Sequence, residues 1–399
     1  MKRAILLVID SLGIGEMDDV KKDRPNDIGS NTLKHVLEHN SMLKLNNLEN
    51  LGLINCLGEE VESFKKSNNC IWGVSNLKHE GADSFYGHYE IVGAKLTKPI
   101  LKSFSEYIDK IYNFLRNSGY SVNVEKKLNK SYLIVDNKVI ISDNIEGEKG
   151  QLYTVLGDEN SDFNVVLEIG KKVREVVEIP RIAVVKCNIN LEELKECIEI
   201  RFNEYIGINA EKANLYNRGY KVVHLGAGIS NEGHCIKKLV ENNIPVVLVG
   251  KVSDIISMNN IKKVSGIHTS DIIKKTLKIL EDFNEGFLFI NIQETDLAGH
   301  LQDKNLYGKQ LEIIDSFIGE IKNIINDDDL FIITADHGND PTIGHGRHTR
   351  EKVPVIVYKK QLKSNSIGLR ESLSDIGATV CEFFHVESID EGKSFFELV

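Results

Sequence analysis

Short, almost wholly apolar runs recur along the chain, and polar stretches or stretches with helical spacing separate them. Each run predicts a β-strand that is buried on both faces. Strands of this kind alternating with helices indicate an α/β fold, in which helices cover both faces of a mostly parallel sheet. The clearest runs occupy residues 3–9, 244–249, 287–292, 330–333 and 353–358, and residues 235–240 have helical spacing.

One of these runs contains a proline, Pro354. Proline cannot donate a backbone hydrogen bond, so within sheets it is confined largely to edge strands and to the first residues of a strand. The run 353–358 is therefore expected either to lie at a sheet edge or to begin close to Pro354.

Three of the predicted strands lead directly into a carboxylate or an imidazole. In open α/β sheets functional groups gather at the carboxyl ends of the strands, so side chains far apart in sequence are expected to meet there. A single such residue is usually a helix cap, but helix capping does not explain an Asp-His pair with another histidine shortly after it. The candidate ligands are Asp10, Asp296, His300, Asp336, His337 and His348.

This set combines three carboxylates with three imidazoles, which is enough to hold two metal ions. Mixed oxygen and nitrogen ligation suits Mn²⁺ or Zn²⁺ better than Mg²⁺, which prefers oxygen ligands and water. Grouped histidines and carboxylates mark metal or catalytic sites. The sequence therefore predicts a two-metal centre, and such centres catalyse displacements at phosphorus.

A nucleophile for such a reaction is available at Ser84. It follows Gly81-Ala82-Asp83 and precedes a segment that is predicted to form a helix through Ile91 and Val92. A hydroxyl at the positive end of a helix, next to a metal ion, can ionise and accept a phosphoryl group. Taken alone, the same serine is better interpreted as an ordinary helix N-cap.

Two other patterns near these residues are weaker. Gly13-Ile14-Gly15 after a strand is reminiscent of a dinucleotide-binding turn, but Asp18 stands where the third glycine belongs and Asp10 would repel a pyrophosphate. His88 and Glu90 could form an acid–base pair, but residues two apart on a helix point in different directions. A structural role is expected for His88.

Composition agrees with a globular enzyme. The chain has 399 residues, 41% of them apolar and 27% charged, which allows two domains and a substantial core. Its formal net charge of −10 argues against nucleic acid as a partner. Scattered cysteines and the absence of a long apolar stretch predict a cytoplasmic protein without a membrane span. Lys251, Arg347 and Arg350 are expected to add positive charge for a small phosphorylated substrate.

Taken together, the motifs resemble those of phosphopentomutases, members of the alkaline phosphatase superfamily. The resemblance runs in order along both ends of the chain, and only residues 94–220 are hard to match. It rests on residues 10–16 (DSLGIGE), 31–33 (NTL), 81–84 (GADS), 250–255 (GKVSDI), 335–342 (ADHGNDPT), 348–351 (HTRE) and 373–379 (LSDIGAT).

This resemblance implies an alkaline-phosphatase-like core, residues 1–94 and 221–399, with an inserted smaller α/β cap domain, residues 95–220. It implies two Mn²⁺ ions, one held by Asp10, Asp336 and His337 and the other by Asp296, His300 and His348. Ser84 would take the place of the family's phosphorylated threonine, and Lys251 would contact the substrate. The implied reaction moves phosphate between positions 1 and 5 of ribose or deoxyribose through a bisphosphate, with a sugar bisphosphate as activator.

The chain also departs from the family pattern, almost wholly on the substrate side. Ala82 replaces a lysine, and the acidic residue that meets the sugar falls on Gly157, with Asp158 one step later. The ligands Asp296 and His300 have a spacing more like that of the cofactor-independent phosphoglycerate mutases. These departures indicate a paralogue that keeps the metal chemistry but acts on a different phosphorylated molecule or a different sugar.

Three functions remain open on the sequence alone. A phosphomutase would return the phosphoryl group to another oxygen of the substrate, whereas a metal-dependent phosphohydrolase or phosphodiesterase would pass it to water. A binding protein without catalysis is the third possibility, and the complete ligand set argues against it. The large inserted segment favours a site that excludes water, and hence a phosphomutase.

Overall fold

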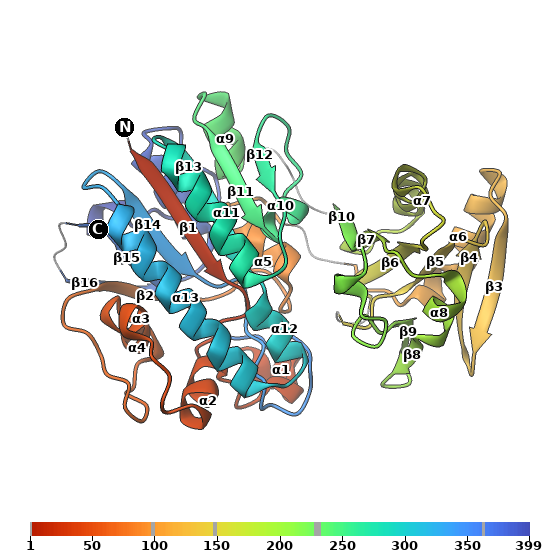
Figure 1. Ribbon diagram of the computed structural model, residues 1–399, viewed down its shortest axis with the longest axis horizontal. Coiled ribbons are helices and arrows are strands. Elements are labelled where there is room, and N and C mark those ends of the chain that lie inside the picture. Colours follow the sequence, from red (N-terminus) through yellow and green to blue (C-terminus); the bar gives the residue numbers. More distant parts are fainter. Residues whose placement is uncertain (1, 97–99, 147–149, 227–232, 361–363) are drawn as a thin grey trace. The chain divides into compact units, whose positions relative to one another are not determined.

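The computed structural model describes residues 2–96, 100–146, 150–226, 233–360 and 364–399 (Figure 1). The chain forms two compact units, Met1–Leu96 with Ile229–Val399 and Thr97–Gly228, and each is described by itself. Within the described ranges, no helix combines the length and the apolar character needed to cross a bilayer.

The larger unit is built on one eight-stranded sheet. In spatial order the strands are β12 (Lys262–Val264), β11 (Val246–Gly250), β13 (Gly286–Ile292), β1 (Arg3–Ile9), β14 (Leu330–Thr334), β15 (Val353–Tyr358), β2 (Ile71–Ser75) and β16 (Asn365–Arg370). The first five strands in this order run parallel, β15 is antiparallel to both of its neighbours, and β16 is parallel to β2.

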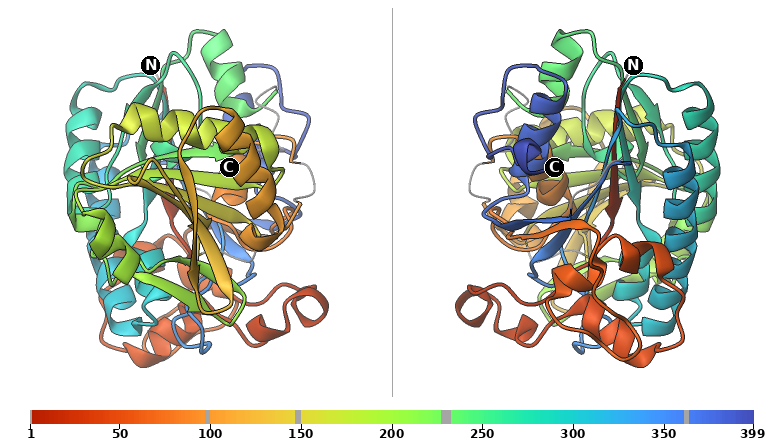
Figure 2. Two further views of the ribbon diagram at one scale, coloured as in Figure 1. Left: turned by 90° about the vertical axis from the view of Figure 1, so that its right-hand side faces the viewer. Right: turned by 90° about the vertical axis from the view of Figure 1, so that its left-hand side faces the viewer.

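Helices cover both faces of this sheet, as the apolar runs predicted. Figure 2 shows the blue-green helices α11 and α13 on one side of the sheet, and α9 and α14 on the other. The first layer contains α2 (Thr32–His39), α3 (Asn46–Asn50), α11 (Thr269–Asp282), α12 (Glu294–His300) and α13 (Lys304–Ile324). The second contains α5 (Ser84–Ile91), α9 (Cys235–Glu241), α10 (Val252–Ile255) and α14 (Ser374–Phe383). Helix α4 (Leu53–Leu57) packs on β15 and β2, and α1 (Val20–Asp23) lies in a connection.

The central strands are buried along their whole length because both of their faces are covered. Every residue of β1, β13 and β14 is buried, which explains why these strands show continuous apolar runs without alternation. The predicted strands and the helix at 235–240 are confirmed. Pro354 is the second residue of β15, which pairs with β14 and with β2. The strand-start interpretation of Pro354 is therefore correct, and the edge interpretation is wrong.

The smaller unit has its own six-stranded sheet with a core on each face. Helices α6 (Phe104–Asn117) and α7 (Phe163–Val176) cover one face. Helix α8 (Leu191–Glu196) and the hairpin of β8 (Ile198–Arg201) and β9 (Tyr205–Ile208) pack on the other. The sheet order is β10 (Lys221–Gly226), β7 (Arg181–Lys186), β6 (Leu152–Gly157), β5 (Val139–Asp143), β4 (Lys130–Val135) and β3 (Val122–Lys127).

Candidate two-metal active site

The carboxyl ends of four neighbouring strands of the larger unit bring the predicted site residues together. Asp10 follows β1, Lys251 follows β11, Asp336 and His337 follow β14, and Asp296 lies in α12, directly after β13. Gly250 is required at the end of β11, since its φ is +81° and a Cβ atom there would lie 2.2 Å from the carbonyl oxygen of Asn291. This close approach of the backbones of Gly250 and Asn291 places Lys251 at the carboxyl ends of the strands.

Ser84 is the first residue of α5, and its hydroxyl oxygen lies at the centre of the group. The N-cap is Asp83, whose carboxylate accepts hydrogen bonds from the amides of Phe85 and Tyr86. Asp83, and not Ser84, is therefore the N-cap of this helix. Its Oγ lies 2.8 Å from Nε2 of His337 and 2.7 Å from Nζ of Lys251.

The three predicted histidine ligands share one orientation. Nδ1 of His300 lies 2.8 Å from the carbonyl oxygen of Gly346, Nδ1 of His337 lies 3.0 Å from that of Gly338, and Nδ1 of His348 lies 3.0 Å from that of Ala82. A carbonyl only accepts, so each Nδ1 carries the hydrogen. In its neutral form each ring therefore turns the lone pair of Nε2 into the site, which is the tautomer that a metal ion needs.

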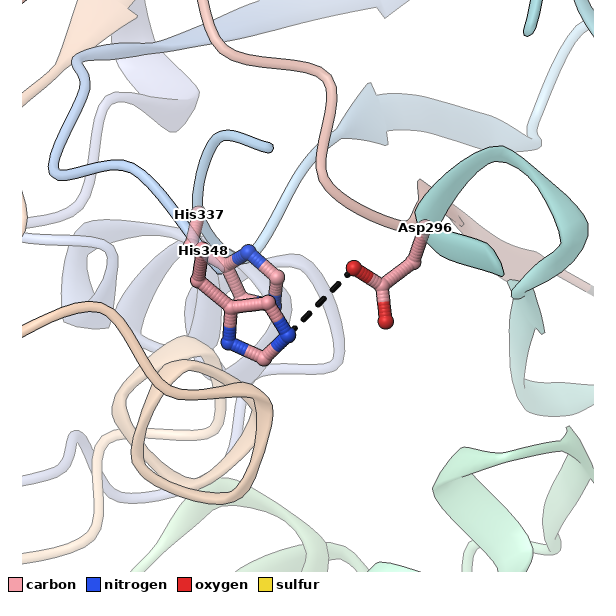
Figure 3. A group of neighbouring side chains, drawn as sticks. All are labelled: Asp296, His337 and His348. Carbon is pink, nitrogen blue, oxygen red and sulfur yellow. Dashed lines mark ion pairs between the residues drawn. The ribbon is translucent and has the colours of Figure 1, made fainter. Parts of the chain in front are cut away.

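One group of ligands forms around Asp296. Its carboxylate lies between two imidazoles, with Oδ1 3.3 Å from Nε2 of His348 and Oδ2 3.4 Å from Nε2 of His300 (Figure 3 shows Asp296 and His348). The two Nε2 atoms are only 3.3 Å apart. Two lone pairs facing each other at this distance repel, and a cation between them removes the repulsion. Asn339 holds the carboxylate in place by donating from Nδ2 to Oδ1 at 2.9 Å.

A second group forms around Asp10 and Asp336, which are both fully buried. Oδ1 of Asp10 and Oδ2 of Asp336 have no hydrogen-bond donor among the described residues. Burial, followed by repulsion from Asp336, raises the pKa of Asp10 to about 7. Burial opposes the charge of His337, but Asp336 outweighs it and raises the pKa of His337 to about 9. Buried carboxylate oxygens without donors are the groups that a divalent cation satisfies.

These two groups fit divalent metal ions. The possible ligand atoms of Asp296, His337 and His348 lie within 4.8 Å of one another, as do those of Asp10, His88 and Asp336. The grouping differs from the expected sets, because His337 lies between them. Its Nε2 is 3.2 Å from Oδ2 of Asp336, and its ring stacks on that of His348 with centroids 3.9 Å apart (Figure 3).

His88, for which a structural or supporting role rather than a catalytic one is expected, also belongs to this site. Its Nδ1 lies 2.6 Å from the carbonyl oxygen of Ser84 and 3.3 Å from Oδ2 of Asp336. Burial lowers the pKa of His88 to about 4, so the ring is neutral and Nδ1 donates its hydrogen. It thus orients the nucleophile and a carboxylate. Glu90 points elsewhere, toward His79, as expected for residues two apart on a helix.

Lys251 is a cation in direct contact with the nucleophile. Its Nζ lies 2.9 Å from Oδ2 of Asp10 and 3.2 Å from Oδ2 of Asp296, in addition to its contact with Ser84. Burial opposes the charge, but the carboxylates of Asp10 and Asp296 outweigh it and raise the pKa of Lys251 above its ordinary value. The side chain therefore stays charged beside the nucleophile.

Two substrate-side departures have a structural basis. Ala82 is fully buried, and its carbonyl oxygen is the acceptor that orients His348. In the smaller unit, a Cβ atom at Gly157 would lie 2.3 Å from Oγ of Ser161 and 2.4 Å from Cγ2 of Val166. No acidic side chain fits there. Asp158 is buried, and its Oδ1 accepts from the amide of Asn160 at 3.0 Å.

Comparisons with known proteins show which family the chain belongs to. The sequence pattern of the metalloenzyme superfamily matches residues 2–388. The phosphopentomutase of Clostridium novyi (strain NT) is 30% identical over 410 residues, covering 99% of this chain and 98% of the relative. That of Acetivibrio thermocellus is 31% identical over 417 residues, covering 99% of both.

Solved structures are more distant. The PH0037 protein from Pyrococcus horikoshii is 14% identical with a TM-score of 0.44 and 96% of each chain covered. A phosphoglycerate mutase from Leishmania mexicana is 12% identical with a TM-score of 0.44, covering 98% of this chain and 97% of the other.

The extent of the sequence match shows that the chain belongs to the metalloenzyme superfamily. Within that superfamily it is a phosphopentomutase-like protein with the alkaline-phosphatase-like α/β core, and it is an enzyme of the phosphomutase type. The resemblance noted from its motifs is thereby confirmed.

Proposed function

We propose that the chain interconverts the 1- and 5-phosphates of ribose or deoxyribose through a phosphoserine at Ser84. The observation that carries this proposal is the position of the Ser84 hydroxyl. It lies within hydrogen-bond distance of Lys251 and His337, at the start of a helix, beside three buried carboxylates. The full-length similarity to phosphopentomutases supports the choice of reaction.

Two Mn²⁺ ions are the proposed cofactors. Asp10, Asp336 and His337 would hold one ion, and Asp296, His300 and His348 would hold the other. When bound, the ions supply positive charge that stabilises the Ser84 oxygen and the phosphoryl oxygens as they react. The proposed assignment is supported by the buried, donorless carboxylate oxygens and by the three imidazoles whose Nε2 atoms face the site.

The side chains of Ser84, Lys251 and His88 have separate roles in the proposed transfer. Phosphorylated Ser84 gives its phosphoryl group to a free hydroxyl of the sugar phosphate, whose proton passes to Oγ of Ser84, and a sugar bisphosphate forms. Oγ of Ser84 then takes the phosphoryl group from the other sugar oxygen, and the proton of the Ser84 hydroxyl passes to that oxygen as its bond to phosphorus breaks, which completes the transfer. Lys251 binds the phosphoryl oxygens from one side, and His88 fixes the backbone of Ser84. A sugar bisphosphate would also charge an enzyme that has lost its phosphoryl group.

We assign residues 95–220 the role of a cap that keeps water away from the bisphosphate. A metal-dependent phosphohydrolase would use the same nucleophile but transfer the phosphoryl group to water, so it would not need an enclosed intermediate. The blocked position at Gly157 favours a second possibility for the substrate, a phosphorylated molecule that does not present its hydroxyls as a pentose does.

Intact mass spectrometry after incubation with ribose 1,5-bisphosphate and Mn²⁺ tests the proposed phosphoserine. The wild-type chain should gain one phosphoryl group, and Ser84→Ala should gain none. Ser253→Ala is the matched control, because Ser253 is also buried but bonds to Asp254. Addition of the phosphoryl group to Ser84→Ala would exclude Ser84 as the nucleophile.

A coupled assay that compares ribose 5-phosphate with other phosphosugars tests the substrate. Turnover of ribose 5-phosphate supports the pentose assignment. Turnover of another phosphosugar alone replaces it, and release of inorganic phosphate without isomerisation would favour the phosphohydrolase.

A further inference from the structure

Two buried charged residues hold the segment that leads to the nucleophile. Residues 77–83 connect β2 to α5, and they form no helix or strand of their own. A segment of this kind has no regular hydrogen-bond ladder, so other groups must satisfy its peptide units. In this segment three carbonyl groups bind one cation, Arg350, and two amides bind one anion, Glu90.

Arg350 binds the carbonyl groups. Its Nη1 donates to the carbonyl oxygens of His79 at 2.7 Å and Gly81 at 2.6 Å, and its Nη2 donates to that of Leu77 at 3.1 Å. Nε and Nη2 also contact Asp19. All five N–H groups of the guanidinium therefore have partners in the protein. Arg350 is 6% exposed. It donates its hydrogen bonds to the backbone and to Asp19, and not to a substrate phosphate.

Glu90 binds the amides. Its carboxylate accepts from the amides of Lys78 at 2.9 Å and His79 at 2.8 Å, and from Nδ1 of His79 at 2.7 Å. It also accepts from Oγ of Ser372 and from the amide of Leu373, which lead into α14. Because Glu90 belongs to the same helix as Ser84, it fixes this helix to the segment that precedes it.

The segment 77–83 is also hydrogen-bonded to one of the proposed metal ligands, His348. Ala82 accepts the hydrogen of His348 Nδ1, and His348 stands two residues before Arg350. The strand-like stretch of His348 to Arg350 is thus bonded to residues 77–82 at four carbonyl groups. A shift of this segment would move Oγ of Ser84 relative to the ligands.

We propose that Arg350 and Glu90 are positioning residues for the transfer reaction, which clamp residues 77–83 from both sides and thereby set where Oγ of Ser84 stands. This inference rests on the proposed function of Ser84 and deepens it. Neither residue touches the reacting atoms. Misplacement of a reacting group by about 1 Å costs about 100-fold in rate, so loosening the clamp is expected to slow the chemical step.

The test compares Arg350→Lys with Arg3→Lys. Lysine keeps the charge but has three donors instead of five. Arg3 is a close match, since it is 5% exposed, pairs with Asp329 and donates to the carbonyl oxygens of Phe283 and Ile324. It lies at the amino end of β1, away from Asp10 at the carboxyl end. Glu90→Gln and Asp315→Asn form a second matched pair, because Asp315 is a buried carboxylate that accepts the amides of Asn47 and Leu48.

Three quantities are measured on the manganese-loaded full chain: kcat, KM and the amide hydrogen exchange of residues 77–89. Arg350→Lys and Glu90→Gln should lower kcat by about 10- to 100-fold, with KM changed by less than about threefold. They should also speed exchange in residues 77–89. The two control variants should keep kcat within about twofold of wild type, even if their thermal unfolding midpoints fall by as much as those of Arg350→Lys and Glu90→Gln.

Equal kcat losses in the test and control variants, or unchanged exchange in residues 77–89, would overturn the clamp. Failure of the proposed function has a different signature, because wild-type enzyme would then show no phosphoserine and no isomerisation. In that case the exchange measurement still decides whether Arg350 and Glu90 hold the segment.

Discussion

The ammonium group of Lys251 lies 2.7 Å from the hydroxyl oxygen of Ser84, although the two residues follow different strands of the sheet. This contact puts a fixed positive charge at the atom that we propose to carry the phosphoryl group. Removing one donor aimed at developing negative charge lowers kcat by about 100- to 1000-fold in other enzymes.

Lys251→Met should therefore lower kcat/KM by about 100-fold or more in a steady-state assay with ribose 5-phosphate. The control is Lys263→Met, which removes an exposed lysine that bonds to the carbonyl oxygen of Ile256. Activity that survives in Lys251→Met as it does in the control would exclude Lys251 from the site.

His300 offers the clearest test of the ligand set around Asp296. His300→Ala removes one Nε2 atom and leaves Asp296 and His348 with an incomplete group. Loss of a group that merely orients a ligand costs about 10- to 100-fold in metal affinity, so loss of a ligand should weaken one Mn²⁺ by at least about 100-fold. Isothermal titration measures this. His39→Ala, an exposed histidine on α2, should titrate as wild type.

Metal affinity should rise with pH. At neutral pH a metal ion must displace protons, because the pKa of Asp10 is raised to about 7 and that of His337 to about 9. Each displaced proton makes the affinity rise about tenfold per pH unit below the pKa of its group. Mn²⁺ titrations from about pH 6 to about pH 9 should therefore show tightening that levels off at the upper end. An affinity independent of pH would contradict the coupling of these two groups to the ion.

The buried carboxylate of Glu90 should make the stability of the fold depend on pH. Burial alone would raise the pKa of the Glu90 carboxyl group, but the hydrogen bonds of His79 outweigh burial and lower this pKa from 4.5 to about 2. A lowered pKa means that ionised Glu90 stabilises the fold above about pH 4.5, and that this contribution is lost as the pH falls toward about 2.

Glu90→Gln should accordingly lower the free energy of unfolding by on the order of 3 kcal/mol at neutral pH. The difference from wild type should shrink between about pH 4.5 and about pH 2, which denaturant titrations at several pH values measure. Gln substitution of the exposed Glu38 should have little effect at any pH. A deficit in Glu90→Gln that stays constant over this range would contradict the stated titration of Glu90.

The sequence predicted the parts of this site that depend on strand ends. Asp10 and Asp336 each follow a continuous apolar run, and such runs end at one edge of a covered parallel sheet. The type of fold followed from the same runs. Asp83 and the helical segment that flank Ser84 drew attention to it, but its role as nucleophile followed from the resemblance to phosphopentomutases.

The remaining parts depend on acceptors that a sequence does not display. Backbone carbonyl groups orient three imidazoles, and they also engage His88 and Arg350. Any residue type has a carbonyl group, so neither the direction of a ring nor the use of a guanidinium can be inferred from residue identity. Arg350 was expected to add charge for a phosphate, but its guanidinium bonds to four residues of the protein itself, Leu77, His79, Gly81 and Asp19. One signal was present for His88, its position one helical turn after Ser84.

The central claim is that two metal ions are held side by side next to Oγ of Ser84. Anomalous diffraction from crystals grown with Mn²⁺ tests it most directly. We predict two peaks, one among Asp10, Asp336 and His337 and the other among Asp296, His300 and His348, each about 2.0–2.3 Å from its ligand atoms. A single peak, or peaks remote from Ser84, would contradict this account.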